Sequence, residues 1–133
     1  MYIHNEAVVL EDRHRDVEEQ SHLHKIGSTK QGTVVAMYDK LKRDPSHNPT
    51  AGKVMKGGPV KDCLISQSEF ILLLRNHNNI LLEGAQVYSL GLNAGFYPFC
   101  TSRDCTPARF LADMGIPHKM LRKVIGTARM HPI

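Results

Sequence analysis

Several features that mark common protein classes are missing from this chain of 133 residues. It has no tryptophan, and aromatic residues make up only 6% of it. This scarcity argues against a stacking platform for single-stranded nucleic acid, which uses aromatic rings. No apolar run approaches the ~20 residues that cross a bilayer, and the longest is Phe70–Leu74. A basic start followed by an apolar stretch is also missing, so we expect no secretory signal, no membrane partner and a cytoplasmic location.

Cysteine is scarce as well, and Cys63, Cys100 and Cys105 form an odd set. Without a secretory signal they are expected to be reduced thiols rather than a disulfide framework. Hydrophobic residues (41%) and charged residues (23%) are close to globular averages, which argues against wholesale disorder. The length suits one ordinary domain, so we expect a single domain over residues 1–133.

Charge is unevenly distributed along the chain. Residues 1–31 hold six acids against four Lys and Arg (−2), whereas residues 103–133 hold six bases against two acids (+4). A basic tail behind an acidic head suits a protein whose C-terminal face meets a polyanion. An ordinary basic surface explains the same numbers.

The first half of the chain predicts a polar head and a small sheet. Residues 1–26 form the acidic head, either a solvated helix over 11–20 or a loosely held arm. Residues 32–65 are predicted to hold the sheet, with β-branched and aromatic residues at 32–39 as the best strand. A hairpin around Gly57-Gly58 follows over 53–65, because paired glycines favour tight turns.

Residues 66–133 are predicted to be mainly helical. Ser66 and Glu69 have the spacing of a capping box, which begins a helix that runs to about Asn76. Residues 80–90 are compatible with either a helix or a strand pair. The chain thus predicts an α+β fold with a small central antiparallel sheet and helices concentrated in the C-terminal half.

The clearest signals for where helices begin and end lie in residues 106–126. Thr106 can cap a helix with Pro107 at its first position, and Gly115 can end that helix. Pro117 then begins a second helix over 117–126. Its predicted buried stripe is Met120, Leu121, Val124 and Ile125, which leaves a basic face on the other side.

This pair resembles the helix-turn-helix DNA-binding class. The residues that carry the resemblance are Phe110, Met114, Gly115, Ile116, Leu121 and Val124, while Leu111 stands where the class usually has a small residue. The resemblance implies a small transcriptional regulator of bacterial or mobile-element type, a homo-oligomer that lays its 117–126 helix on double-stranded DNA. It also implies His118 and Lys119 near base edges, and Arg122, Lys123 and Arg129 on phosphates.

Other functions compete with DNA binding. The helix pair can be a plain hairpin with a solvated basic face, and the chain can be a small protein-binding modulator or inhibitor without catalytic activity, with the acidic head or residues 96–99 as its contact. A zinc ion on Cys100, Cys105 and His118 is less favoured, because structural zinc sites normally have a tighter cysteine pair. A metal on His14, His22 and His24 is also less favoured than a solvated arm.

Enzyme activity is the less favoured class. Cys100 or Cys105 beside Arg103 and Asp104 would be an activated thiolate, because a positive neighbour lowers the pKa of a thiol. No complete catalytic set accompanies either cysteine, so we assign no catalytic residue, no cofactor and no metal.

Overall fold

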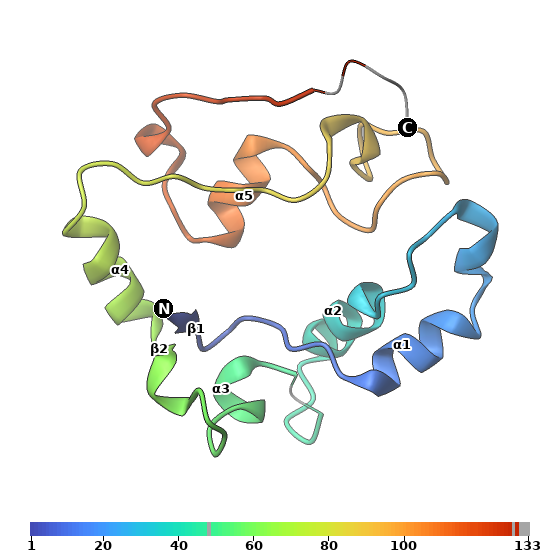
Figure 1. Ribbon diagram of the computed structural model, residues 1–133, viewed down its shortest axis with the longest axis horizontal. Coiled ribbons are helices and arrows are strands. Elements are labelled where there is room, and N and C mark those ends of the chain that lie inside the picture. The colour runs from blue at the N-terminus through green and yellow to red at the C-terminus, as the bar shows by residue number, and fades with distance from the viewer. Residues whose placement is uncertain (48, 129, 131–133) are drawn as a thin grey trace. The chain divides into compact units, whose positions relative to one another are not determined.

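The structure is a computed structural model that describes residues 1–47, 49–128 and 130 (Figure 1). The chain divides into two compact units, Met1–Leu81 and Leu82–Ile133. The expectation of a single domain over 1–133 stays a prediction. No helix among the described residues is long and apolar enough to cross a membrane.

In the first unit, the N-terminal residues form an extended thread that pairs with later segments. Strand β1 (Ile3–His4) lies parallel to β2 (Leu64–Ile65), with Ile3 opposite Leu64. Further along, the Val9 amide donates to the Pro49 carbonyl at 2.7 Å. The predicted antiparallel sheet within 32–65 is therefore wrong, because half of the observed two-stranded sheet comes from the acidic head and its strands are parallel.

Two helices of the first unit, α1 (Asp12–Glu19) and α2 (Thr33–Lys42), pack side by side (Figure 1). For residues 11–20 the sequence left two alternatives, a solvated helix or a loosely held arm, and α1 confirms the helix. The strand predicted at 32–39 is wrong. Ala36 and Asp39, three residues apart, are the buried positions of α2, and this spacing places both side chains on one helix face.

The rest of the first unit is helical in short pieces. The predicted hairpin over 53–65 is wrong, since α3 (Ala51–Val54) and a 3₁₀ helix (Lys61–Cys63) occupy that stretch. Helix α4 (Gln67–Arg75) confirms the predicted capping box. The Ser66 hydroxyl accepts the Glu69 amide at 3.3 Å, and the Glu69 carboxylate accepts the Ser66 amide at 2.7 Å.

The second unit is centred on α5 (Pro107–Asp113). Its predicted start is confirmed, because the Thr106 hydroxyl accepts the Arg109 amide at 3.3 Å. Its predicted end is confirmed by Gly115, which takes the left-handed conformation with φ of +65°. Residues 80–90 are neither of the predicted forms and contain one 3₁₀ turn, Tyr88–Leu90. The buried apolar residues of this unit are Cys105, Leu111 and Ile116.

The second predicted helix, over 117–126, is wrong. The structure has a 3₁₀ turn at His118–Met120, and residues 121–128 are irregular. Pro117 offers no side-chain cap, and Val124 and Ile125 are β-branched residues that disfavour a short isolated helix. The stripe predicted to be buried is exposed, with Ile125 69% accessible. The described residues therefore form no helix-turn-helix pair.

Candidate functional site

A glycine-framed loop, residues 27–32, connects the 3₁₀ helix His22–Ile26 to α2. Its backbone is left-handed at Gly27 (φ +70°), Lys30 (φ +49°) and Gly32 (φ +85°). The Ser28 hydroxyl accepts the Lys30 amide at 3.2 Å and tightens the turn. Left-handed residues interspersed in a turn are a backbone pattern found in anion-binding concavities.

The 27–32 loop has donors that the rest of the described chain does not use. Among the described residues, no acceptor pairs with the backbone amides of Thr29 and Gln31. The Thr29 side chain is exposed and that of Lys30 is half-buried. The loop thus presents amides, a hydroxyl and an ammonium within three residues, a donor set that suits the oxygens of a phosphate or carboxylate.

A buried carboxylate holds the end of this loop and the start of α2. Glu18, in α1, is only 2% exposed. Its Oε2 accepts the Gly32 amide at 2.7 Å, and its Oε1 accepts the Val34 amide at 2.8 Å. A negative charge at this position satisfies amides that have no partner within the helix and complements the helix dipole.

A second buried carboxylate, Asp39, joins α1 to α2. Arg13 donates to its Oδ2 at 2.7 Å, and the Lys42 ammonium donates to its Oδ1 at 3.0 Å. Hydrogen bonds from Arg13 and then Lys42 lower the pKa of Asp39 to about 2. The ring of the fully buried His14 places Nε2 3.4 Å from the same carboxylate. This cluster fixes the helix that carries the 27–32 loop.

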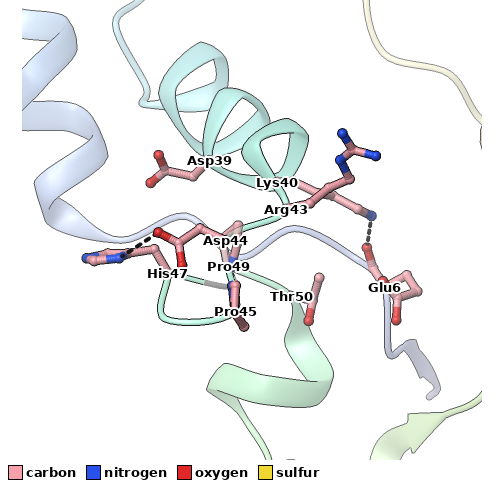
Figure 2. A pocket seen from close by; sticks show the side chains of 9 residues that line it. All are labelled: Glu6, Asp39, Lys40, Arg43, Asp44, Pro45, His47, Pro49 and Thr50. Atoms are coloured by element: carbon pink, nitrogen blue, oxygen red, sulfur yellow. Dashed lines mark hydrogen bonds and ion pairs between the residues drawn. The ribbon is translucent and has the colours of Figure 1, made fainter.

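A hollow of about 330 Å³ lies beside the C-terminal end of α2 (Figure 2). The Lys40 ammonium donates to the Glu6 carbonyl across it, and His47 lies 3.7 Å from Asp44. Arg43 makes no ion pair with another described residue. The ten residues of α2 span about 15 Å, so Arg43 and the 27–32 loop cannot hold the same phosphate within one chain. The hollow's lining is Glu6, Asp39, Lys40, Arg43, Asp44, Pro45, His47, Pro49 and Thr50.

In the second unit, the two charged side chains of α5 pair with each other, and Arg103 joins them. Arg103 and Arg109 both contact Asp113, at 2.7 and 2.8 Å. The Arg103 guanidinium also lies over the Phe110 ring, 5.2 Å from its centre. That ring packs where Gly84 has no side chain, since a Cβ there would lie 2.3 Å from it. These contacts hold the 84–110 region together.

The cysteine alternatives from the sequence receive no support from the geometry. The three cysteines are free. Burial raises the pKa of the Cys105 thiol and outweighs the opposite effect of Arg103, so this residue is not an activated thiolate. Among the described residues, no three His, Cys, Asp or Glu side chains group where they could hold a metal ion. Thus Cys100, Cys105 and His118 are not brought together as zinc ligands, and the same holds for His14, His22 and His24.

The basic side chains that the resemblance assigned to DNA lie on the surface of the second unit. His118 and Lys119 belong to the 3₁₀ turn, and Arg122 and Lys123 to the irregular segment after it, all exposed. Arg129 lies outside the described residues. They share no helix face, and a binding role for these side chains stays a prediction.

Neither the 27–32 loop nor Glu18 was predicted from the sequence. Gly32 was instead predicted to begin a strand. The available signal was a short polar segment with a glycine at each end and Thr29-Lys30 between them. Glu18 gave no local signal, because the amides that it accepts lie 14 or more residues away.

Comparison with known proteins gives the chain a family. A family model for adenylosuccinate synthetase matches residues 52–131. The N6-succino-2-amino-2'-deoxyadenylate synthase of Vibrio phage phiVC8 is 50% identical over 133 residues, which cover 98% of this chain and 39% of the phage protein. The adenylosuccinate synthetase of Methanococcus vannielii is 31% identical over 127 residues, covering 93% of this chain and 36% of that protein.

A solved structure agrees with these relatives. The Cyanophage S-2L succinoaminodeoxyadenylate synthetase, bound to dGMP and to dATP as an energy donor, superposes with a TM-score of 0.79 at 32% identity. The match covers 89% of this chain and 34% of that protein. The chain thus spans about two fifths of the length of the curated relatives that it matches.

These relatives overturn the function that the sequence analysis favoured. They are synthases and synthetases, and the solved one binds nucleotides. The helix-turn-helix resemblance, the transcriptional regulator, the non-catalytic modulator and double-stranded DNA as partner are therefore wrong, and the self-association implied by that class has lost its basis. The α+β fold with an antiparallel sheet and a helix-turn-helix ending is wrong for the same reason. With more than half of its residues matched by the family model, this chain belongs to the adenylosuccinate synthetase family.

Proposed function

We propose that this chain is part of a synthase that replaces O6 of a 2-amino-6-oxopurine deoxynucleotide with the nitrogen of aspartate, and that its 27–32 loop binds a phosphate of a nucleotide. The observation that carries the proposal is the 50% identity to the Vibrio phage phiVC8 synthase over nearly the whole chain. Identity to the Methanococcus vannielii synthetase is lower, at 31%. This difference favours a substrate that already has an amino group at C2.

The chemistry follows from the groups in such a product. dGMP already has the 2-amino group, so only its O6 must be replaced by a nitrogen that bears the succino carbons. Aspartate is the amine with that carbon skeleton. An oxo group at C6 is a poor leaving group, so the γ-phosphoryl group of dATP is transferred to O6, and dADP leaves. The aspartate amine then forms its bond to C6 and loses a proton to water, the C6–O6 bond breaks, and inorganic phosphate departs with O6.

The 27–32 loop fits a binding role rather than a chemical one. Its unused amides at Thr29 and Gln31 and the nearby Lys30 ammonium can donate to phosphate oxygens. Charge-assisted bonds of this kind contribute about 1.5–3 kcal/mol each. The cytoplasm, predicted from the sequence, is a compartment where nucleotides and aspartate are both available, and we include it in the proposal.

Calorimetric titration of the purified chain with dGMP tests this function. We expect dGMP to bind and dTMP, a pyrimidine nucleotide, to bind more weakly. Lys30→Ala and Thr29→Ala should each raise the Kd for dGMP roughly 10-fold or more, because each removes a donor to phosphate. Lys53→Ala, an equivalent change at an exposed lysine of α3, should leave the Kd unchanged. Equal Kd values for all three variants and the parent chain, or no binding of dGMP, would overturn the proposal.

A further inference from the structure

We infer that Glu18 is a positioning residue for nucleotide binding: it does not touch the nucleotide, and it fixes the 27–32 loop in its binding conformation by accepting the amides at the start of α2. This inference rests on the proposed function of that loop. Glu18 lies in α1, outside the loop, and its side chain is 2% exposed.

The two oxygens of Glu18 hold adjacent parts of the backbone. Oε2 accepts the Gly32 amide at 2.7 Å, the last residue of the loop, while Oε1 accepts Val34 at 2.8 Å and Val35 at 3.4 Å, in the first turn of α2. One carboxylate thus bridges the end of the loop and the beginning of the helix. Any rotation of one relative to the other would break a charge-assisted hydrogen bond.

Close packing removes the remaining freedom at this end of the loop. Gly32 lies against α1, where an added Cβ would stand 2.8 Å from the His14 Cβ and 3.0 Å from the Arg15 nitrogen. The other end is tied by the Gly27 and Ser28 amides, which both donate to the Leu23 carbonyl. The short run between these anchors carries the unused donors of Thr29 and Gln31.

Glu18 also decides which amides an anion can reach. The carboxylate occupies the amides of Gly32, Val34 and Val35, so these three amides are not available to a phosphate. Two opposite effects of removing the charge can therefore be told apart. If Glu18 positions the loop, its loss weakens nucleotide binding. If Glu18 merely blocks the helix terminus, its loss frees amides for phosphate and strengthens binding.

Glu18→Gln is the sharpest variant. The glutamine oxygen can still accept one amide, but its NH₂ group faces a second backbone donor and cannot accept from it. We expect the Kd for dGMP to rise about tenfold, the equivalent of one hydrogen bond to a charged group, and the amide signals of Thr29 and Gln31 to broaden in ¹⁵N-resolved spectra. Should Glu18→Gln not fold, Glu18→Asp keeps the charge and shortens the reach by one methylene.

A matched control separates positioning from general loss of stability. Ser66→Ala removes the cap of α4 and should cost about 1 kcal/mol of folding free energy without changing the Kd for dGMP. An unchanged or lower Kd in the Glu18 variant, with Thr29→Ala and Lys30→Ala still weakening binding, would overturn the role of Glu18 alone. If those two loop variants also leave the Kd unchanged, the proposed function of the loop fails as well.

Discussion

The Asp39 carboxylate is buried and pairs with two cations, Arg13 and Lys42, so its protonation should govern acid stability. Arg13 and Lys42 hold its pKa at about 2, against an ordinary value of 3.8. A lowered pKa means that the folded state favours the charged form. The stabilisation is thus complete above about pH 4 and is lost as the pH falls through 2. Both cations are partly exposed, which reduces the contribution to about 1–2 kcal/mol.

We expect Asp39→Asn to lower the free energy of unfolding by that amount at pH 7. The difference between variant and parent should shrink between about pH 4 and 2, because the parent loses the same charge there. Urea denaturation followed by circular dichroism over this pH range measures it. Asp62→Asn, at an exposed position of the 3₁₀ helix Lys61–Cys63, is the control and should be close to neutral. A difference that stays constant with pH would show that the charge of Asp39 is not the cause.

At the scale of elements, glycine conformation sets the junction between the 27–32 loop and α2. A residue with a Cβ at this junction would be destabilised in two ways, by the left-handed backbone and by the lack of space. Three glycines of the chain allow these two effects to be measured separately. Gly57 has open space at its Cβ position, Gly27 has open space but φ of +70°, and Gly32 combines φ of +85° with a contact of 2.8 Å to the His14 Cβ. A left-handed conformation costs a residue with a Cβ about 1–2 kcal/mol, and overpacking adds about 1–3 kcal/mol.

We therefore expect a graded series of alanine variants in urea unfolding. Gly57→Ala should be nearly neutral, Gly27→Ala should lose about 1 kcal/mol, and Gly32→Ala about 2–5 kcal/mol. Equal losses at Gly27 and Gly32 would mean that α1 yields to the added methyl group. In that case the close packing invoked for the loop would not constrain it.

Elements with local end signals were predictable from the sequence, and elements fixed by distant partners were not. The capping box of Ser66 and Glu69 and the Thr106-Pro107 start each lie within four residues of the helix they begin. Helix α2 has no such signal. Its β-branched start, Thr33-Val34-Val35, favours a strand by a few tenths of a kcal/mol per residue. The Val34 and Val35 amides of that start donate to Glu18, which lies more than a helix length away in the chain.

At the scale of the whole molecule, the same distinction explains why the functional class was missed. Residues 103–133 do have an excess of positive charge and a capped helix start, but neither property indicates what the chain binds. The candidate site instead depends on Glu18 in α1 and on the 27–32 loop, which are separate segments of the chain. Only folding places the Glu18 carboxylate beside Gly32, and no periodic pattern in the sequence predicts this contact.

The surface of the first unit also carries a continuous apolar stripe on α2, opposite the face that packs on α1. Val34, Met37, Tyr38 and Leu41 follow helical spacing and are 39–69% exposed, so they line one side of the helix.

We expect the purified chain to bind the dye ANS at this apolar stripe of α2, since contiguous apolar patches are unusual on isolated soluble domains. Leu41→Lys should lower ANS fluorescence without changing the helical circular dichroism. Val17→Lys should not, because Val17 is exposed among the charged residues of α1 and has no apolar neighbours on that helix. Equal fluorescence changes in both variants would mean that the dye reports scattered side chains rather than the stripe.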